Sequence, residues 1–327
     1  MLVVQPLPGI GDMVWHLPHI RAIAAATGGP VTLLAKPRSL ADQLLQAETT
    51  VRDVVWLDRN PERRQGRHDG GRGWWRLVAT LRARRFSRAY LLHHSRSLAF
   101  LLAAAGIPSR HGYGYGLDRL FLNRGPFLPR ATFWRHPFDQ ASAWLAAAGI
   151  EMPEAEPILP VDPGLQAAVR ARLGGRTPVA IGIGSSEAYK QWGAERFAAL
   201  VRSLAEAGWK DPVLVGGPAE QGLAEAIQAG SGDAAQLAVG WPLPEVAALF
   251  AQSAFYVGND TGVMNLAAAV GLRTYGLFGA VPPFHHSSRI VPITPPGGID
   301  KADGMARITV EAVMAAIEAD RDARRTG

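Results

Sequence analysis

Short apolar runs alternate with longer amphipathic segments along the first half of the chain. Runs rich in Val, Leu and Tyr, which favour buried strands, lie at residues 1–7, 31–36, 54–58 and 89–94. Apolar residues at the three-to-four-residue spacing of helices follow at residues 16–26, 39–47 and 96–106. Strands that take turns with helices predict parallel sheets with right-handed crossover connections.

A proline-rich stretch without periodicity, EMPEAEPILPVDPG at residues 151–164, interrupts this alternation. Afterwards strand-like runs return at 177–186, 211–217, 254–260 and 275–280, with helical runs at 195–208, 219–230 and 243–253. We therefore predict an α/β protein of two doubly wound, Rossmann-like domains, residues 1–158 and 159–327. Open α/β sheets bind ligands at the carboxyl ends of their strands, so the cleft between the domains is the expected site.

Composition narrows the class of protein. The chain has 327 residues, of which 48% are apolar, so each domain can bury its own core and a disordered or fibrous protein is excluded. With no cysteine, neither a disulfide nor a thiolate metal site is available. The N-terminus lacks the basic region of a signal peptide, and no run reaches the roughly eighteen apolar residues of a membrane span. These features predict a soluble cytoplasmic protein.

One segment carries the basic charge of the chain. Residues 59–88 hold ten arginines against Glu62 and Asp69, a local charge of +8 that leaves about −2 for the rest of the formal +6. The segment is either a solvated loop followed by an amphipathic helix around Trp74, or a surface that attracts anions. Nucleic-acid binding is the least favoured alternative, because the remainder is acidic and no nucleic-acid-binding module is present.

The first strand-to-helix junction is the loop PLPGIGD. Gly9 and Gly11 permit close approach of a ligand to the backbone, ahead of a helix N-terminus. Val14 stands where the dinucleotide fingerprint needs its third glycine, so that site is excluded. Asp12 is either a helix cap or a general base that faces the cleft.

The second junction, GIGSSEAYKQW, combines two hydroxyls with a positive charge. Ser185 and Ser186 follow a predicted strand, and Lys190 comes shortly after them. The spacing of a Walker A motif is missing. Hydroxyls, backbone N–H groups and a lysine at such a junction favour phosphate binding, while a surface lysine is the simpler alternative.

The third junction is GNDTGVMNLAAAVG. Asp260 or Thr261 is the predicted N-cap of a helix whose first N–H groups begin at Gly262. Such an N-terminus carries about half a positive charge and favours anions. Phosphate binding and tight packing of strand against helix both explain the small residues here.

Four segments, in order, resemble the lipopolysaccharide heptosyltransferase family, glycosyltransferase family nine. They are PGIGDMVWHLPHIRAI, AGIPSRHGYG, SSEAYKQWGAERFAALVRSLAEAGW and VGNDTGVMNLAAAVGLRTYGLFGAVPP. The resemblance covers nearly the whole chain and implies the GT-B fold, in which two Rossmann-like domains face each other. It also implies an inverting, metal-independent transfer of a sugar, typically heptose from ADP-heptose, onto a growing lipopolysaccharide core, with no cofactor.

The same resemblance implies roles for individual residues. Asp12 would deprotonate the acceptor hydroxyl in the acceptor-binding first domain. In the donor-binding second domain, Ser185, Ser186 and Lys190 would hold the diphosphate, and Asp260, Thr261 and Gly262 would hold phosphate and sugar. Glu220 would reach the ribose, and Trp241 and Leu243 would lie near the base. Gly9, Gly11 and Asn265 complete the predicted substrate-binding set. The family usually has histidine at the position of Asn265, and histidine followed by proline at the positions of Gly182 and Ile183.

Acceptors of this family are anionic glycolipids, which implies a peripheral contact with the cytoplasmic face of the inner membrane. Two other functions share the phosphate-binding loops: a non-catalytic nucleotide-sugar-binding protein and a sugar-nucleotide epimerase of the GT-B fold. His93 and His94, after a predicted strand, belong either to the acceptor side of the cleft or to a polar loop. No carboxylate neighbours His285 and His286 at ligand spacing, so no metal site is expected.

Overall fold

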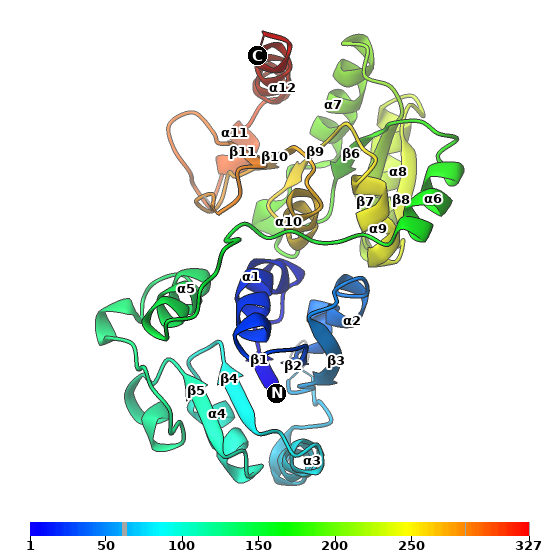
Figure 1. Cartoon of the computed structure of the whole chain (residues 1–327). Helices are drawn as coiled ribbons and strands as arrows, with labels where there is room; N and C mark the ends of the chain where they lie inside the picture. Colours follow the sequence, from blue (N-terminus) through cyan, green and yellow to red (C-terminus); the bar gives the residue numbers. More distant parts are fainter. Residues whose placement is uncertain (61–63, 285, 327) are drawn as a thin grey trace. The chain divides into compact units, whose positions relative to one another are not determined.

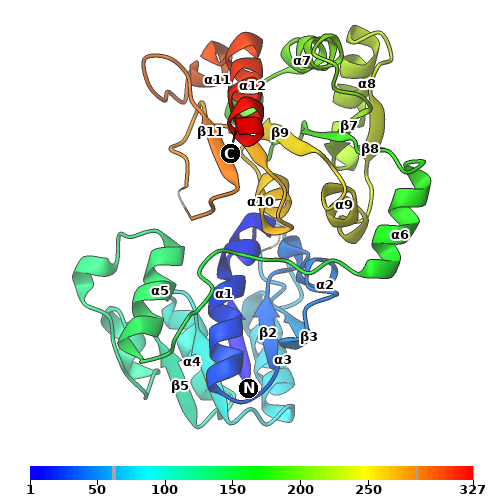
Figure 2. The ribbon, with the colours of Figure 1, turned by 45° about the horizontal axis from the view of Figure 1, so that its top comes forward.

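The computed structural model describes residues 1–60, 64–284 and 286–326 of the chain (Figure 1). They form two compact units, Met1–Pro157 and Ile158–Gly327. Each unit has its own sheet with helices packed around it (Figure 2). Among the described residues, none of the helices combines the length and the hydrophobicity that crossing a membrane requires.

The first unit is built on a five-stranded parallel sheet of order β3-β2-β1-β4-β5. Its strands are β1 (Leu2–Gln5), β2 (Val31–Ala35), β3 (Val51–Trp56), β4 (Arg88–Leu91) and β5 (Ser109–Gly112). Its helices are α1 (Ile10–Ala26), α2 (Ala41–Leu44), α3 (Gly70–Ala83), α4 (Arg96–Ala104) and α5 (Pro137–Ala147), with 3-10 turns η1 (Pro37–Ser39), η3 (Gly116–Leu120) and η4 (Arg130–Thr132). The strand order reverses direction between β1 and β4, the kind of position at which such sheets bind ligands.

The second unit has a six-stranded parallel sheet of order β11-β10-β9-β6-β7-β8. Its strands are β6 (Val179–Gly182), β7 (Pro212–Gly216), β8 (Gln236–Val239), β9 (Phe255–Asn259), β10 (Thr274–Leu277) and β11 (Ile290–Ile293). Its helices are α6 (Pro163–Arg172), α7 (Ala194–Glu206), α8 (Gln221–Gly230), α9 (Leu243–Phe250), α10 (Gly262–Ala269), α11 (Gly304–Arg307) and α12 (Val310–Thr326), with 3-10 turns η5 (Ala188–Lys190) and η6 (Pro218–Glu220). Here the strand order reverses between β6 and β9.

Burial follows the predicted periodicity, and the predicted fold class is confirmed. In α7, Phe197, Val201 and Leu204 are buried at helical spacing against the second sheet. In α3, Leu77 and Leu81 are buried at helical spacing in the core of the first unit. The pattern did not predict β5, β8 and β11, because each is a four-residue strand at the edge of its sheet and lacks a fully buried apolar run.

Candidate functional site

Four loops of the second unit leave the carboxyl ends of four adjacent strands. They are residues 183–192 after β6, 217–220 after β7, 240–242 after β8 and 260–261 after β9. Because the strands are parallel, all four loops lie at one edge of the sheet. The two predicted phosphate-binding segments of this unit, after β6 and after β9, therefore lie side by side at the β6–β9 reversal of strand order.

Asn259 joins two of these loops. Its buried side chain, at the end of β9, donates hydrogen bonds to the carbonyl oxygens of Ile183 at 3.0 Å and Gly184 at 3.2 Å. Its Nδ2 also lies 3.0 Å from Oε1 of Gln191, and its Oδ1 accepts from the backbone N–H of Trp192 at 3.2 Å. Asn259 is not among the predicted site residues, although a polar side chain at the end of the strand run FYVGN was a signal for it.

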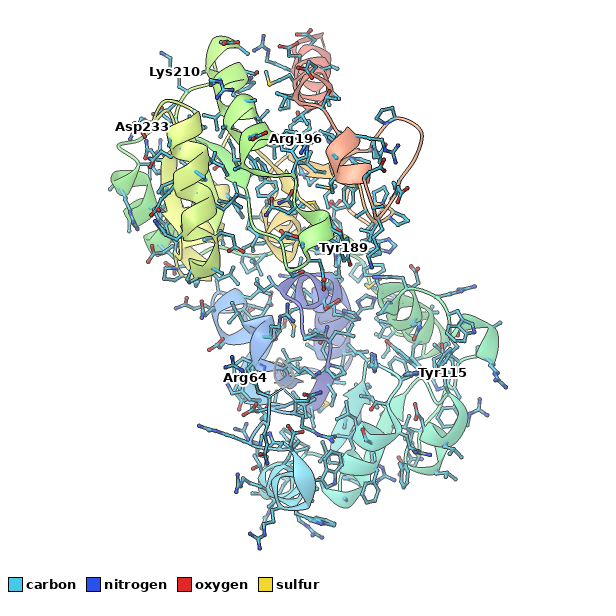
Figure 3. The ribbon with its side chains drawn as sticks, turned by 180° about the vertical axis from the view of Figure 1, so that it is seen from behind. Arg64, Tyr115, Tyr189, Arg196, Lys210 and Asp233 are labelled. Carbon is cyan, nitrogen blue, oxygen red and sulfur yellow. The ribbon has the colours of Figure 1, made fainter. Side chains whose placement is uncertain are left out.

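Lys190 and Asp260 form an ion pair between the loop after β6 and the loop after β9. Nζ of Lys190, the last residue of η5, lies 2.6 Å from Oδ2 of Asp260, and the two side chains are only 20% and 12% exposed. Tyr189, labelled in Figure 3, marks the position of this turn. A lysine ammonium has three N–H donors, so an anion can bind Lys190 while Asp260 holds it in place.

The N-terminus of α10 lies directly after Asp260. Thr261 is its N-cap with extended backbone, as predicted, and no side chain among the described residues caps this helix end. The first N–H groups of a helix have no partner inside the helix. An uncapped N-terminus beside a half-buried lysine is a suitable environment for phosphate oxygens.

Asn265, one turn into α10, is buried and its Oδ1 accepts no hydrogen bond in the described structure. In strand β9, the buried hydroxyl of Tyr256 occupies space that two glycines leave free. A Cβ atom added to Gly182 would stand 1.7 Å from this hydroxyl oxygen, and one added to Gly258 would stand 2.7 Å from it. Any side chain at position 182, where the family usually has histidine, would therefore displace Tyr256.

The remaining predicted donor residues lie on the neighbouring loops. Ser185 donates from Oγ to the carbonyl oxygen of Glu187 at 2.8 Å, and Ser186 is exposed. The carboxyl carbon of Glu220 lies 3.6 Å from the Cβ position that Gly184 lacks, so Glu220 is beside the serine loop. A carboxylate beside the serine loop can accept hydrogen bonds from ribose hydroxyls.

Trp241 and Leu243 come from the loop after β8 and the first residue of α9. The Arg172 guanidinium carbon lies 3.6 Å from the Trp241 ring centroid and so covers one face of the indole, while its Nη1 pairs with Glu245 at 3.2 Å. Leu243 is 7% exposed. Both residues follow β8, the outermost strand, at the same sheet edge as the loops after β6 and β9.

Asp12 belongs to the first unit, at the carboxyl end of β1. The predicted loop at residues 8–12 is shorter than expected, because α1 already begins at Ile10 and includes Gly11 and Asp12 in its first turn. Oδ2 of Asp12 accepts the Gly9 N–H at 2.9 Å, so the carboxylate does cap the helix. Burial raises the pKa of Asp12 above its usual value, which makes the ionised form a stronger base.

A cavity of about 350 Å³ adjoins the loop after β1. It is lined by residues of that loop and of three other segments, among them Pro8, Lys36, Arg59, His93 and Ser95. Burial lowers the pKa of His93 to about 4, so its imidazole is neutral at physiological pH. The described residues include no group of three His, Cys, Asp or Glu side chains arranged to hold a metal ion, and His285 lies outside them.

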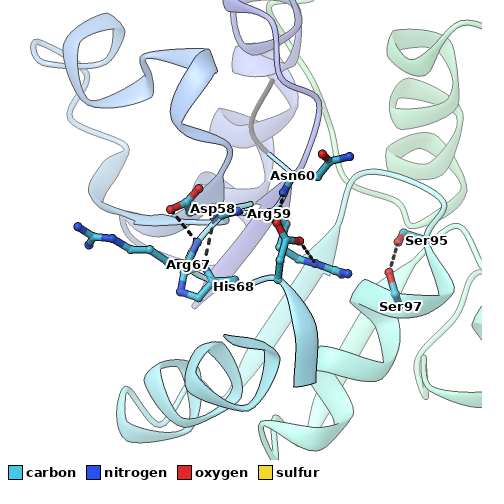
Figure 4. A network of polar contacts seen from close by, with 9 residues as sticks. Asp58, Arg59, Asn60, Arg67, His68, Ser95 and Ser97 are labelled. Carbon is cyan, nitrogen blue, oxygen red and sulfur yellow. Dashed lines mark hydrogen bonds and ion pairs between the residues drawn. The ribbon is translucent and has the colours of Figure 1, made fainter. Parts of the chain in front are cut away.

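The loop at the start of the basic segment is held by two acidic side chains (Figure 4). Oδ2 of Asp58 accepts the Arg67 N–H at 3.1 Å, and Oδ2 of Asp69 accepts the Asn60 and Gly66 N–H groups, both at 2.7 Å. Arg63 lies outside the described residues. The described residues of the segment therefore form a hydrogen-bonded loop followed by α3, and most of their arginine side chains are exposed.

The sequence profile of glycosyltransferase family 9 (heptosyltransferase) matches residues 74–295, a range that contains the four strand-end loops of the second unit but not Asp12. Comparison with curated protein sequences finds no match.

Solved structures share the fold of both units. E. coli ADP-heptose LPS heptosyltransferase II is similar with a TM-score of 0.77 and 22% identity, over 97% of this chain and 97% of that one. A family 9 glycosyl transferase from Veillonella parvula has a TM-score of 0.80 and 20% identity, over 97% and 95%. E. coli heptosyltransferase WaaC with ADP-2-deoxy-2-fluoro heptose has a TM-score of 0.74 and 19% identity, over 98% and 99%.

These likenesses confirm the GT-B fold, and the profile match covers about two thirds of the chain. The chain therefore belongs to glycosyltransferase family 9, the heptosyltransferase family, and is a glycosyltransferase.

Proposed function

We propose that this protein transfers heptose from ADP-heptose, with inversion and without a metal ion, onto an anionic acceptor of the lipopolysaccharide type. The observation that carries the proposal is the Lys190–Asp260 pair beside the uncapped N-terminus of α10. The solved WaaC structures hold ADP or an ADP-heptose analogue, which supports the choice of donor.

In the proposed reaction, ionised Asp12 takes the proton of an acceptor hydroxyl. The hydroxyl oxygen attacks the anomeric carbon of heptose as the bond from that carbon to the ADP oxygen breaks on the opposite face, which inverts the configuration. The leaving diphosphate gains negative charge, which Lys190 and the N–H groups of α10 neutralise. Glu220 and the loop at Trp241 would orient the nucleoside.

A donor panel tests the proposal. We expect ADP-heptose to raise the thermal stability of the protein more than GDP-, UDP- or dTDP-sugars do, because a ligand at a hundred times its dissociation constant adds about 2.7 kcal/mol. Consumption of the donor only when a glycan acceptor is present would separate the transferase from a non-catalytic binder and from an epimerase. A preference for another base would show that the donor assignment is wrong.

We propose that the basic segment binds the anionic headgroup of the acceptor, because its first residue, Arg59, lines the cavity next to the loop before Asp12 and most of its other described arginines are exposed. Replacing Arg63, Arg64 and Arg67 by serine is expected to raise the KM for the acceptor about fivefold per arginine at low salt, since each is worth roughly 1 kcal/mol near an anionic surface. Donor affinity should stay unchanged.

The matched control for this prediction is Arg170→Ser, which removes an exposed arginine from α6 of the other unit. It should leave the KM for the acceptor unaltered. If the triple variant also behaves like wild type at low salt, the segment is only a solvated loop.

A further inference from the structure

Three large apolar side chains are exposed on two neighbouring turns of the first unit. Leu117 and Leu120 belong to η3 and are 54% and 70% exposed. Trp134 follows η4 and is 89% exposed, more than the other large apolar side chains exposed in the described part of the chain. We call these three residues, with Arg119, Arg130 and Arg135, the 117–134 surface.

Buried contacts hold the two turns in place. Oη of Tyr115, labelled in Figure 3, lies 2.6 Å from Oγ1 of Thr132 in a buried hydrogen bond that joins the start of η3 to the end of η4. Nε of Arg119 donates to the carbonyl oxygen of Gly114 at 2.7 Å, and the ring of Phe133 packs edge-on to Tyr115. The apolar side chains are therefore exposed by a fixed backbone, and they are not parts of a frayed chain end.

Positive charge surrounds the exposed apolar groups. Residues 108–136 contain five arginines and one acidic residue, Asp118, which is buried. Arg124, Arg130 and Arg135 form no ion pair with a carboxylate of the described residues. Residues 59–88 were the only basic segment predicted, because the arginines of residues 108–136 are spread among apolar residues.

A cavity of about 620 Å³ opens at this surface. Its lining includes Arg96, Arg119, Arg130, Leu117 and Trp134. Guanidinium groups next to exposed Trp and Leu match the interface of an anionic bilayer, where tryptophan lies at the headgroup level and arginine binds lipid phosphate. A soluble anionic sugar would use the arginines but would leave Leu120, which is outside the cavity lining, without a role.

We propose that the 117–134 surface docks on an anionic phospholipid bilayer. Leu117, Leu120 and Trp134 enter the headgroup boundary, and Arg119, Arg130 and Arg135 bind lipid phosphates. The inference deepens the proposed function, on which it rests for the nature of the acceptor, by naming the surface that meets the membrane. Vesicle binding itself needs neither donor nor turnover. The membrane-docking proposal and the proposed transferase function can therefore fail separately.

The test is binding of the full chain to vesicles of phosphatidylcholine with and without phosphatidylglycerol. We expect Leu120→Ser with Trp134→Ser to reduce partitioning onto phosphatidylglycerol vesicles by about tenfold or more. Arg130→Ser with Arg135→Ser should reduce it by about fivefold per arginine, and only at low salt. Ile158→Ser, at a 49% exposed residue of the other unit, is the matched apolar control and should bind like wild type.

Lipids brominated on their acyl chains test the depth of insertion. They should quench the fluorescence of Trp134, and Trp134→Phe should keep vesicle binding while losing that part of the quenching. Wild-type vesicle binding by the Leu120→Ser, Trp134→Ser variant would overturn the proposal. Equal binding to vesicles with and without phosphatidylglycerol would also overturn it. So would association of the 117–134 surface with another protein when the chain does not bind vesicles. Turnover with a lipid-free acceptor reports on the proposed function alone.

Discussion

Asp12→Asn is expected to lower turnover by about 10²- to 10⁴-fold, the usual contribution of a general base, while ADP affinity stays nearly unchanged. The amide cannot accept the acceptor proton, but its oxygen can still accept the Gly9 N–H that Asp12 now accepts at 2.9 Å. The helix cap is therefore preserved. Measuring kcat with a soluble acceptor and ADP affinity by calorimetry checks both expectations.

The pH dependence of the same variant gives a second readout. Burial raises the pKa of Asp12, so wild-type kcat/KM should fall as pH drops through that raised pKa, and Asp12→Asn should lack this limb. Because the folded pKa lies above the unfolded one, ionised Asp12 costs stability at neutral pH, and the cost disappears as pH falls through the folded pKa. The amide variant should thus be no less stable than wild type at pH 7.

Asp12→Ala is the control that separates the two roles of this residue. It removes the cap as well as the base, and should lose about 1 kcal/mol of stability in addition to activity. Wild-type turnover in Asp12→Asn would remove Asp12 from the mechanism and leave it as a helix cap.

Lys190→Ala is expected to weaken binding of ADP by about 10- to 100-fold, because hydrogen bonds to charged groups are worth about 1.5–3 kcal/mol. The variant also leaves the 12% exposed Asp260 side chain without its partner, beside the diphosphate. The loss should grow as salt is lowered, since it removes a charge attraction. Calorimetric titration with ADP at two salt concentrations measures it.

Asp260→Ala should also weaken ADP binding, but less and without that salt dependence, because it frees Lys190 from the position in which the 2.6 Å ion pair holds it. If Asp260 acts through Lys190, the double variant should bind ADP about as well as Lys190→Ala alone. Additive losses would show that Asp260 contacts the ligand independently. Unchanged ADP affinity in Lys190→Ala would place its charge outside the donor site.

Local sequence was sufficient for the parts of the site that depend on one strand and its following helix. The run FYVGND followed by TGVMNLAAA predicted both the end of β9 and the start of α10 at Gly262, because a capping residue before an apolar helix leaves a local signature. The first turn of α1 was placed too late, since two glycines and an aspartate look like loop residues until Asp12 is seen to bond the Gly9 N–H.

The sequence by itself determined the α/β alternation, the two sheets' central strands and the strand-to-helix junctions that contain Asp12, Lys190 and Gly262. Only the tertiary structure decided that Lys190 pairs with Asp260, seventy residues away, and that Asn259 joins the loops after β6 and β9. Those contacts follow from the neighbouring positions of β6 and β9 in the sheet, and strand order has no signature in local periodicity. The exposure of Leu120 and Trp134 was likewise decided by the buried Tyr115–Thr132 bond, because apolar residues in a sequence predict burial by default.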